Sequence, residues 1–143
     1  MAFAYKMSRN GKHITVLGKG ELTIEDGIKI LKIILKDPRC SPDQTALIDL
    51  RRASFPNLEG GKLLALANLI EDFEFMFKNH IAIVAQSSTL LAAELLSFHV
   101  RTAKNISIRV FVDGAAAREF CMQGWSSRGT SHSSSGKPLC VPA

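Results

Sequence analysis

The sequence predicts an α/β protein with a mixed, mainly parallel five-stranded sheet covered by about four helices, in the order β-β-α-β-α-β-α-β-α. Three observations support this fold class. Strand and helix patterns alternate along most of the chain, the later strands are continuously apolar, and an Asn10-Gly11 turn joins the first two strand patterns. Alternation and continuous apolar strands are typical of a parallel sheet that helices cover on both faces. Asn-Gly instead favours an antiparallel hairpin, so the sheet is expected to be mixed.

The first three elements are two short strands and a helix. Residues 2–7 and 13–18 are rich in aromatic and β-branched side chains, which favour strands. Thr23 is a good N-cap for the helix that follows, and apolar residues recur at helical spacing over residues 24–35. Asp37-Pro38 is expected to end this helix.

The second half of the chain repeats a strand-helix unit three times. Strands are predicted at residues 46–50, 81–85 and 107–112. Helices are predicted at residues 61–77, from about 87 to about 103, and from 115 to about 122. In the first of these helices, one stripe of apolar residues is predicted to face inward, namely Leu63, Leu66, Ala67, Ile70, Phe73 and Phe77.

Composition places the chain among ordinary globular proteins. Its 143 residues suit one domain, and 46% of them are hydrophobic and 22% charged. No apolar segment follows a basic start, and the most apolar region, residues 81–100, is interrupted by polar residues. We therefore expect neither a secretory signal nor a membrane-spanning helix. Three cysteines without metal-type spacing suggest reduced thiols in a cytoplasmic protein.

The last eighteen residues differ in composition from the rest. Residues 126–143 are rich in serine and glycine and are expected to form a disordered tail after a single domain at residues 1–125. Arg128 and Lys137 in this tail carry two of the positive charges behind the net charge of +5. No dense basic tract is left elsewhere, so we expect no nucleic-acid binding.

This layout resembles the STAS-like domains of the SpoIIAA type, which include bacterial anti-sigma-factor antagonists. The resemblance covers almost the whole predicted domain. It depends on the N-terminal hairpin and on a set of strand and cap motifs, namely Gly20–Thr23, Ala46–Leu50, His80–Ala85, Ile108–Asp113 and Ala115–Phe120. The resemblance implies the fold described above and a regulatory, non-enzymatic role.

The resemblance also points to one loop. In such domains the strand that ends in Asp-Leu leads to a loop whose serine is phosphorylated by an anti-sigma kinase. Aligning Asp49 and Gly60 with that pattern places Asn57 at the acidic position, Leu58 at the phosphoacceptor position and Glu59 after it. Leu58 has no hydroxyl group. The resemblance therefore implies a divergent member that lacks the phosphoacceptor serine and its switch.

Polar residues at the carboxyl ends of the strands form the candidate ligand or partner site, because loops and helix N-termini meet there in open α/β sheets. These candidates are Asp49, Arg51, Arg52, Asn57, Leu58, Glu59, Gly60, Ser87 and Asp113. Each also has a structural interpretation. Asp49 can bind loop amides, Arg51 and Arg52 can be surface residues of a loop, Gly60 can serve a turn, and Ser87 and Asp113 can cap helices.

No catalytic pattern accompanies these residues. The four histidines are scattered without metal-ligand spacing, and the chain has neither a G-x-S-x-G nucleophile motif nor a G-x-G-x-x-G loop. We therefore expect no enzyme activity, no metal site and no cofactor.

The helices carry more apolar residues than one buried face requires. The residues expected to lie off the core, and so to form a subunit contact, are Leu64, Phe75, Met76, Leu90 and Leu96. Leu91, Leu95 and Phe98 are expected to face inward on the same helix as Leu90. Two alternatives remain open, which are deeper burial by the domain itself and a pocket for an apolar small molecule between the helices.

The functional prediction is a cytoplasmic regulatory or protein-interaction domain of the STAS-like type, homodimeric and without the serine phospho-switch. Its protein partner is not identified by the sequence. The alternative is a small-molecule binding protein for a lipid or an anionic ligand. Such a protein would use an interhelical pocket or the carboxyl-terminal edge of the sheet.

Overall fold

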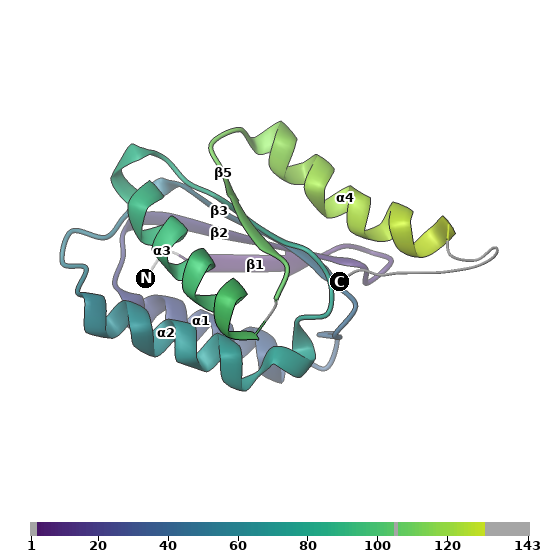
Figure 1. Cartoon of the computed structure of the whole chain (residues 1–143), viewed down its shortest axis with the longest axis horizontal. Helices are drawn as coiled ribbons and strands as arrows, with labels where there is room; N and C mark the ends of the chain where they lie inside the picture. Colours follow the sequence, from purple (N-terminus) through teal and green to yellow (C-terminus); the bar gives the residue numbers. More distant parts are fainter. Residues whose placement is uncertain (1–2, 105, 131–143) are drawn as a thin grey trace.

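The computed structural model describes residues 3–104 and 106–130, apart from the side chains of residues 87, 88, 103 and 126–130. Figure 1 shows one sheet between two helical layers. The strands are β1 (Phe3–Met7), β2 (His13–Glu21), β3 (Thr45–Ser54), β4 (Ile81–Val84) and β5 (Ile108–Phe111). The helices are α1 (Ile24–Lys36), α2 (Gly60–Asp72), the 3-10 turn η1 (Glu74–Met76), α3 (Ser87–Lys104) and α4 (Gly114–Thr130). The predicted element order is confirmed.

The sheet is mixed, as predicted. Its strand order is β1-β2-β3-β4-β5; β1 and β2 pair antiparallel, and all other neighbours pair parallel. The turn of the hairpin is closed by the amide of Ser8, which donates to the carbonyl of His13 at 2.9 Å. Gly11 has a φ of 72°, a conformation that glycine adopts without strain.

Helices cover both faces of the sheet unequally (Figure 1). On one face, β2 packs against α1, and β4 and β5 pack against α2 and α3. On the other face, α4 packs against β3, β4 and β5 through a small core of Leu47, Ala82, Val84, Ala117, Phe120 and Cys121. All four residues of β4 are buried because this strand lies between both layers.

The start of α1 follows the sequence prediction closely. The side chain of Thr23 accepts a hydrogen bond from the amide of Asp26 at 3.1 Å, and the Asp26 carboxylate accepts one from the amide of Thr23 at 3.0 Å. This reciprocal pair is a capping box, which satisfies two backbone donors that the first helical turn leaves unpaired.

Several boundaries differ from the prediction, and strand β2 ends at Glu21 instead of residue 18. Strand β3 continues through Arg51 and Arg52, which were assigned to a loop, because the extended β2 provides parallel partners as far as Glu21. Helix α2 ends at Asp72, before the separate turn η1. Helix α4 continues to Thr130 because no proline interrupts it, so residues 126–130, which were assigned to the tail, are helical. The rest of the predicted tail lies outside the described residues.

Candidate functional site

Asp49 and Arg51 form an ion pair at the carboxyl-terminal part of β3. The Asp49 carboxylate accepts hydrogen bonds from the Arg51 amide at 3.0 Å, from its Nε at 3.0 Å and from its Nη2 at 2.8 Å. These contacts with Arg51 lower the pKa of Asp49, and the same carboxylate raises the pKa of Arg51. The charges of Asp49 and Arg51 therefore largely neutralise each other.

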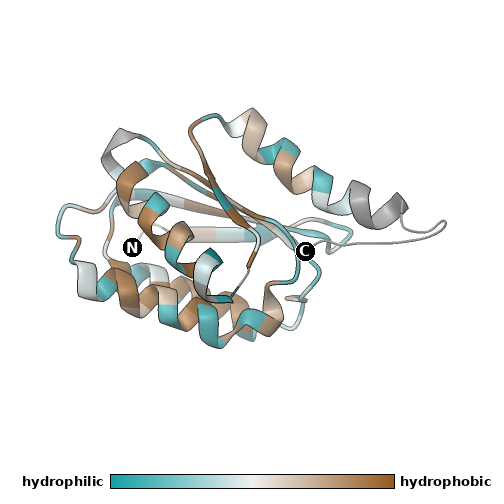
Figure 2. Ribbon diagram, in the orientation of Figure 1, coloured by the Kyte–Doolittle hydropathy of each residue, from teal (hydrophilic) through white to brown (hydrophobic). Residues whose placement is uncertain are grey.

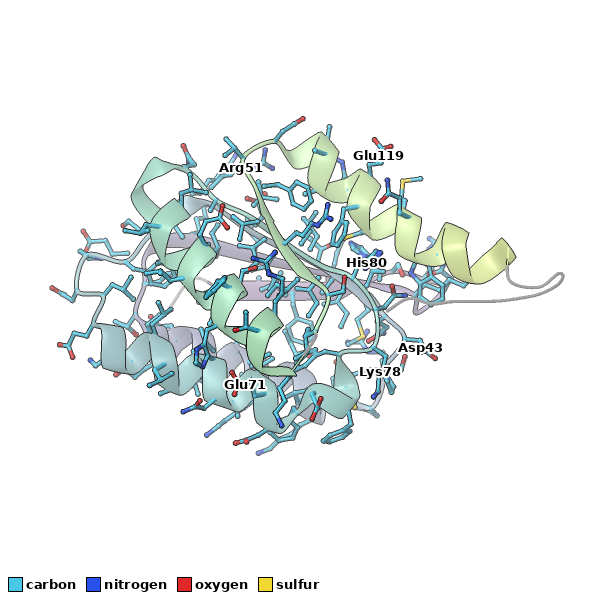
Figure 3. The ribbon with its side chains drawn as sticks, viewed as in Figure 1. Asp43, Arg51, Glu71, Lys78, His80 and Glu119 are labelled. Carbon is cyan, nitrogen blue, oxygen red and sulfur yellow. The ribbon has the colours of Figure 1, made fainter. Side chains whose placement is uncertain are left out.

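Arg51 also packs against the start of α4. A Cβ atom on Gly114 would lie 3.0 Å from Nη1 of Arg51, so the glycine leaves room for the guanidinium. Asp113 lies nearby and its charge raises the pKa of Arg51 further. Its Oδ1 accepts a hydrogen bond of 3.0 Å from the Ala115 amide, as expected of a residue that caps α4. Figure 3 shows Arg51 beside the connection between β5 and α4.

An open cleft of about 760 Å³ contains this pair. It is lined by Leu17, Asp49, Arg51, Arg52, Gln86 and Val112. The structure thus brings together three of the predicted site residues and adds Gln86, which the sequence analysis did not single out. Within the described part of the chain Arg52 has no ion-pair partner, so it is the cleft residue with a charge left for an anion.

The remaining candidates lie outside this cleft. Residues 57–60 line neither this cleft nor the apolar cavity described below, and Leu58 is 36% exposed. Glu59 is the N-cap of α2 but makes no side-chain hydrogen bond there. Ser87 is the first residue of α3, and its side chain lies outside the described residues. Thr89 instead bonds Gln86, since its Oγ1 accepts from the Gln86 amide at 3.3 Å.

A second cavity lies under α1 and α2, and the sequence analysis did not locate it. It has a volume of about 170 Å³. Its lining comes from α1, from α2 and the turn after it, and from the adjacent sheet face, and is almost entirely apolar; it includes Val16, Gly27, Ile30, Ile48, Phe55, Leu66, Ile70, Met76 and Phe77. The one sequence signal for this space is Gly27, a glycine inside a helix whose added Cβ would lie 4.0 Å from Leu66.

The predicted subunit contact is partly wrong. Met76 lines the cavity, Leu96 is only 9% exposed in the core, and Leu90 packs against that core. The residues predicted to face inward are instead exposed, with Leu91 at 71%, Leu95 at 53% and Phe98 at 60%. Helix α3 is apolar around most of its circumference, so its pattern did not determine which side faces the sheet. Leu64 and Phe75 are exposed, as predicted.

His13 and His80 contact neighbouring side chains, and Cys121 is buried in the core. His13 Nδ1 lies 2.7 Å from Thr45 Oγ1, and His80 Nδ1 lies 2.7 Å from Ser107 Oγ. His80 also stacks on Phe120 with 4.2 Å between ring centroids. Burial raises the pKa of Cys121 to about 11, so its thiol stays protonated and unreactive near neutral pH.

Two further observations concern metal ions and membranes. Across residues 3–104 and 106–130, no three His, Cys, Asp or Glu side chains converge as metal ligands. None of the helices described for this chain combines the length and the apolar character that crossing a bilayer requires.

Comparison with known proteins identifies the fold. No family model matches the chain, and no curated protein matches it. Among solved structures, it is similar to an uncharacterized protein of the DUF3478 family with a SpoIIAA-like fold from Shewanella loihica. The TM-score is 0.52 at 19% identity, over 84% of this chain and 92% of that one. The chain therefore has a SpoIIAA-like α/β fold, which confirms the fold that the sequence resemblance implied.

Proposed function

We propose that this protein is a non-enzymatic STAS-like binding domain that holds a small apolar molecule, or an apolar part of a larger one, in the cavity under α1 and α2. The observation that carries this proposal is the cavity itself, a partly open space of about 170 Å³ lined by almost purely apolar side chains. In this proposal the protein works in the cytoplasm, without nucleic acid and without a serine phospho-switch.

The energetic argument rests on packing. Space that side chains leave unfilled in a sealed core costs about 24 cal/mol per Å³, which sets an upper bound of roughly 4 kcal/mol for a partly open cavity of about 170 Å³. That is a large part of the roughly 5–15 kcal/mol by which domains are stable. An apolar occupant would recover much of this loss through contacts with the lining. An engineered apolar cavity of about 150 Å³ is known to bind benzene.

The chemistry of the lining selects the class of ligand. The most polar lining side chain is Gln44, and its amide already donates to the carbonyls of Gly11 at 2.9 Å and Arg39 at 3.0 Å. A ligand inside the cavity would therefore gain few hydrogen bonds, and a polar group placed there would lose those it makes in water. A hydrocarbon chain or an unsubstituted ring fits these surroundings.

The experiment uses Gly27, which faces this space from α1. Replacing Gly27→Leu adds an isobutyl group toward Leu66, whereas Gly27→Ala adds one methyl at an ordinary contact distance. We expect fluorobenzene, followed by fluorine NMR, to bind the wild type and Gly27→Ala. Binding to Gly27→Leu should be at least about tenfold weaker, because the side chain occupies the volume. Equal binding to all three proteins, or none to the wild type, would contradict the proposal.

Native mass spectrometry on freshly purified protein provides a second readout. A bound apolar molecule should add mass to the wild type and to Gly27→Ala but not to Gly27→Leu.

A second candidate function is supported by the exposed apolar residues of α2, η1 and α3. In this alternative the protein is a regulatory domain that binds another protein through what we term the outer helical face, which comprises Leu64, Phe75, Leu91, Leu95 and Phe98. Figure 2 shows that hydrophobic segments recur along both α2 and α3. Large contiguous apolar patches are rare on monomers and mark interaction sites. Replacing Leu95→Glu should abolish such binding and leave fluorobenzene binding unchanged.

A further inference from the structure

The residues of the outer helical face come from α2, η1 and α3. Helices α2 and α3 each follow one of the parallel strands of the sheet and lie on the same face of it, so they run in the same direction. Two side-chain contacts join α2 and the following turn η1 to α3. Glu71 contacts His99 at 3.1 Å, which is an ion pair when His99 is protonated, and Glu74 of η1 pairs with Lys104 at 3.5 Å. Figure 3 places Glu71 between these helices. Leu64 on α2 therefore lies near the Leu91 end of α3, and Phe75 lies near its Lys104 end.

Two charged residues border the apolar stripe of α3. Glu94 and Arg101 are exposed and stand seven residues apart, so they lie on the same side of the helix about 10 Å apart along its axis. Phe98 lies almost midway between them. Neither charge forms an ion pair with another side chain among the residues that the structure describes.

This arrangement is self-complementary. A two-fold axis perpendicular to α3 and close to Phe98 would bring α3 of a second copy antiparallel against the first. Such an axis keeps each flank of the helix on the same side, so Glu94 of each copy would come level with Arg101 of the other. The Phe98 rings would meet near the axis, next to both Leu95 side chains. The same operation would bring the Leu64 end of α2 opposite the Phe75 end of the second copy.

We propose that the outer helical face is a homodimer interface in which α3 packs antiparallel against α3 of a second copy, with Glu94 of each copy paired to Arg101 of the other. This inference rests on the second candidate function, in which the same face is an interaction surface. A second copy is favoured over an unrelated partner because a two-fold interface must be complementary to itself. Along the axis of α3, this face carries an acid before its apolar centre at Phe98 and a base after it.

The size of the face is compatible with a modest dimer. Its five apolar side chains are 48–71% exposed and together present on the order of 500 Å². Stable interfaces bury about 800 Å² per partner, with a polar rim around an apolar centre. The polar residues around the stripe, Asn68, Glu94, Arg101 and Thr102 among them, would supply that rim.

The test reverses the two charges. Sedimentation velocity over a series of concentrations should show the wild type as a dimer. Each single change, Glu94→Arg or Arg101→Glu, would place like charges opposite each other twice in the dimer. We expect each to weaken dimerisation by about tenfold or more. The double variant Glu94→Arg/Arg101→Glu restores opposite charges across the axis and should return the dimer to within about threefold of the wild type.

A matched control lies on the other face of the sheet. Met122 on α4 is 68% exposed, and Met122→Glu should leave the dimer unchanged. Phe98→Glu should instead sediment as a monomer, and its circular dichroism spectrum should show that it is folded. A monomeric wild type, or a double variant as weakened as the single ones, would overturn the proposed dimer. Fluorobenzene binding is measured on the same samples. It tests the cavity proposal independently, so failure of the dimer proposal can be told apart from failure of the cavity proposal. A monomeric wild type that still binds an unrelated protein through Leu95 would leave the interaction surface standing and refute the second copy as its occupant.

Discussion

The indole nitrogen of Trp125 donates a hydrogen bond of 3.0 Å to the carbonyl oxygen of Lys12, which ties α4 to the hairpin between β1 and β2. The Lys12 ammonium in turn lies 5.2 Å from the centroid of the indole ring. The same indole nitrogen is 3.3 Å from Thr45 Oγ1 at the start of β3. One side chain thus joins the last helix to both the first turn of the chain and the central strand.

Replacing Trp125→Phe should lower the free energy of unfolding by about 1 kcal/mol, because the ring remains while its hydrogen bonds are lost. Trp125→Ala should cost about 2–3 kcal/mol, since much of the aromatic contact is lost as well. Urea denaturation followed by circular dichroism measures both values. If neither variant changed the midpoint, the C-terminal part of α4 would contribute nothing to stability.

His13 should make stability depend on pH. Burial lowers its pKa below the ordinary value of 6.5, so the folded protein binds this proton less readily than the unfolded chain. The neutral His13 side chain makes its full contribution to stability above pH 6.5. This contribution is lost as the pH falls through the pKa that His13 has in the folded protein. Between about pH 7.5 and pH 5.5, the wild type should lose more stability than His13→Gln. Parallel losses in the two proteins would show that His13 does not carry this dependence.

Gly27→Ala should stabilise the protein by about 0.5–1 kcal/mol. Glycine in a helix interior is less favourable than alanine by about that amount, and the new methyl group meets only Leu66, at 4.0 Å. Thermal unfolding monitored by circular dichroism provides the measurement. A lower melting temperature would mean that α1 and α2 approach more closely than the structure shows.

Phosphorylation should be absent from residues 57–61. Leu58 occupies the position that the resemblance assigns to the phosphoacceptor, and neither it nor Asn57, Glu59, Gly60 or Gly61 carries a hydroxyl group. Phosphopeptide mapping of protein from its native host would check this. Ser54, at the end of β3, is the informative residue, since high occupancy there would show that a switch has moved by a few residues and has not been lost.

Much of the fold could be predicted from the sequence because local signals and apolar periodicity agree. The Asn10-Gly11 turn, the Thr23 cap and the continuously apolar β4 each have one plain structural interpretation, and the structure has all three. The predicted end of β3 was wrong because Arg51 and Arg52 are charged, as loop residues often are. The strand continues because Arg52 and the two residues after it pair with β2, which is more than 30 residues away in the chain.

The candidate site was harder to predict for the same kind of reason. Asp49, Arg51 and Arg52 were found because strand ends converge at one sheet edge. An apolar pocket between helices was left open as an alternative, but its position could not be predicted, because a residue that lines a cavity and one that fills a core have the same pattern. Met76 shows this, since its position off the main stripe predicted a subunit contact, yet it lines the cavity.

Phe75→Glu tests whether the outer helical face extends beyond α3. Phe75 is 55% exposed and its ring contacts only Phe73 among the described aromatic rings, with 5.8 Å between centroids. The variant should stay folded but dimerise more weakly, because a charge would lie within an apolar contact. Phe77→Glu is the matched contrast, since Phe77 lines the cavity and a charge there should unfold the domain. Light scattering and circular dichroism on the same samples separate these outcomes. An unfolded Phe75→Glu would place Phe75 in the core, and a folded variant with undiminished dimer would limit the interface to α3.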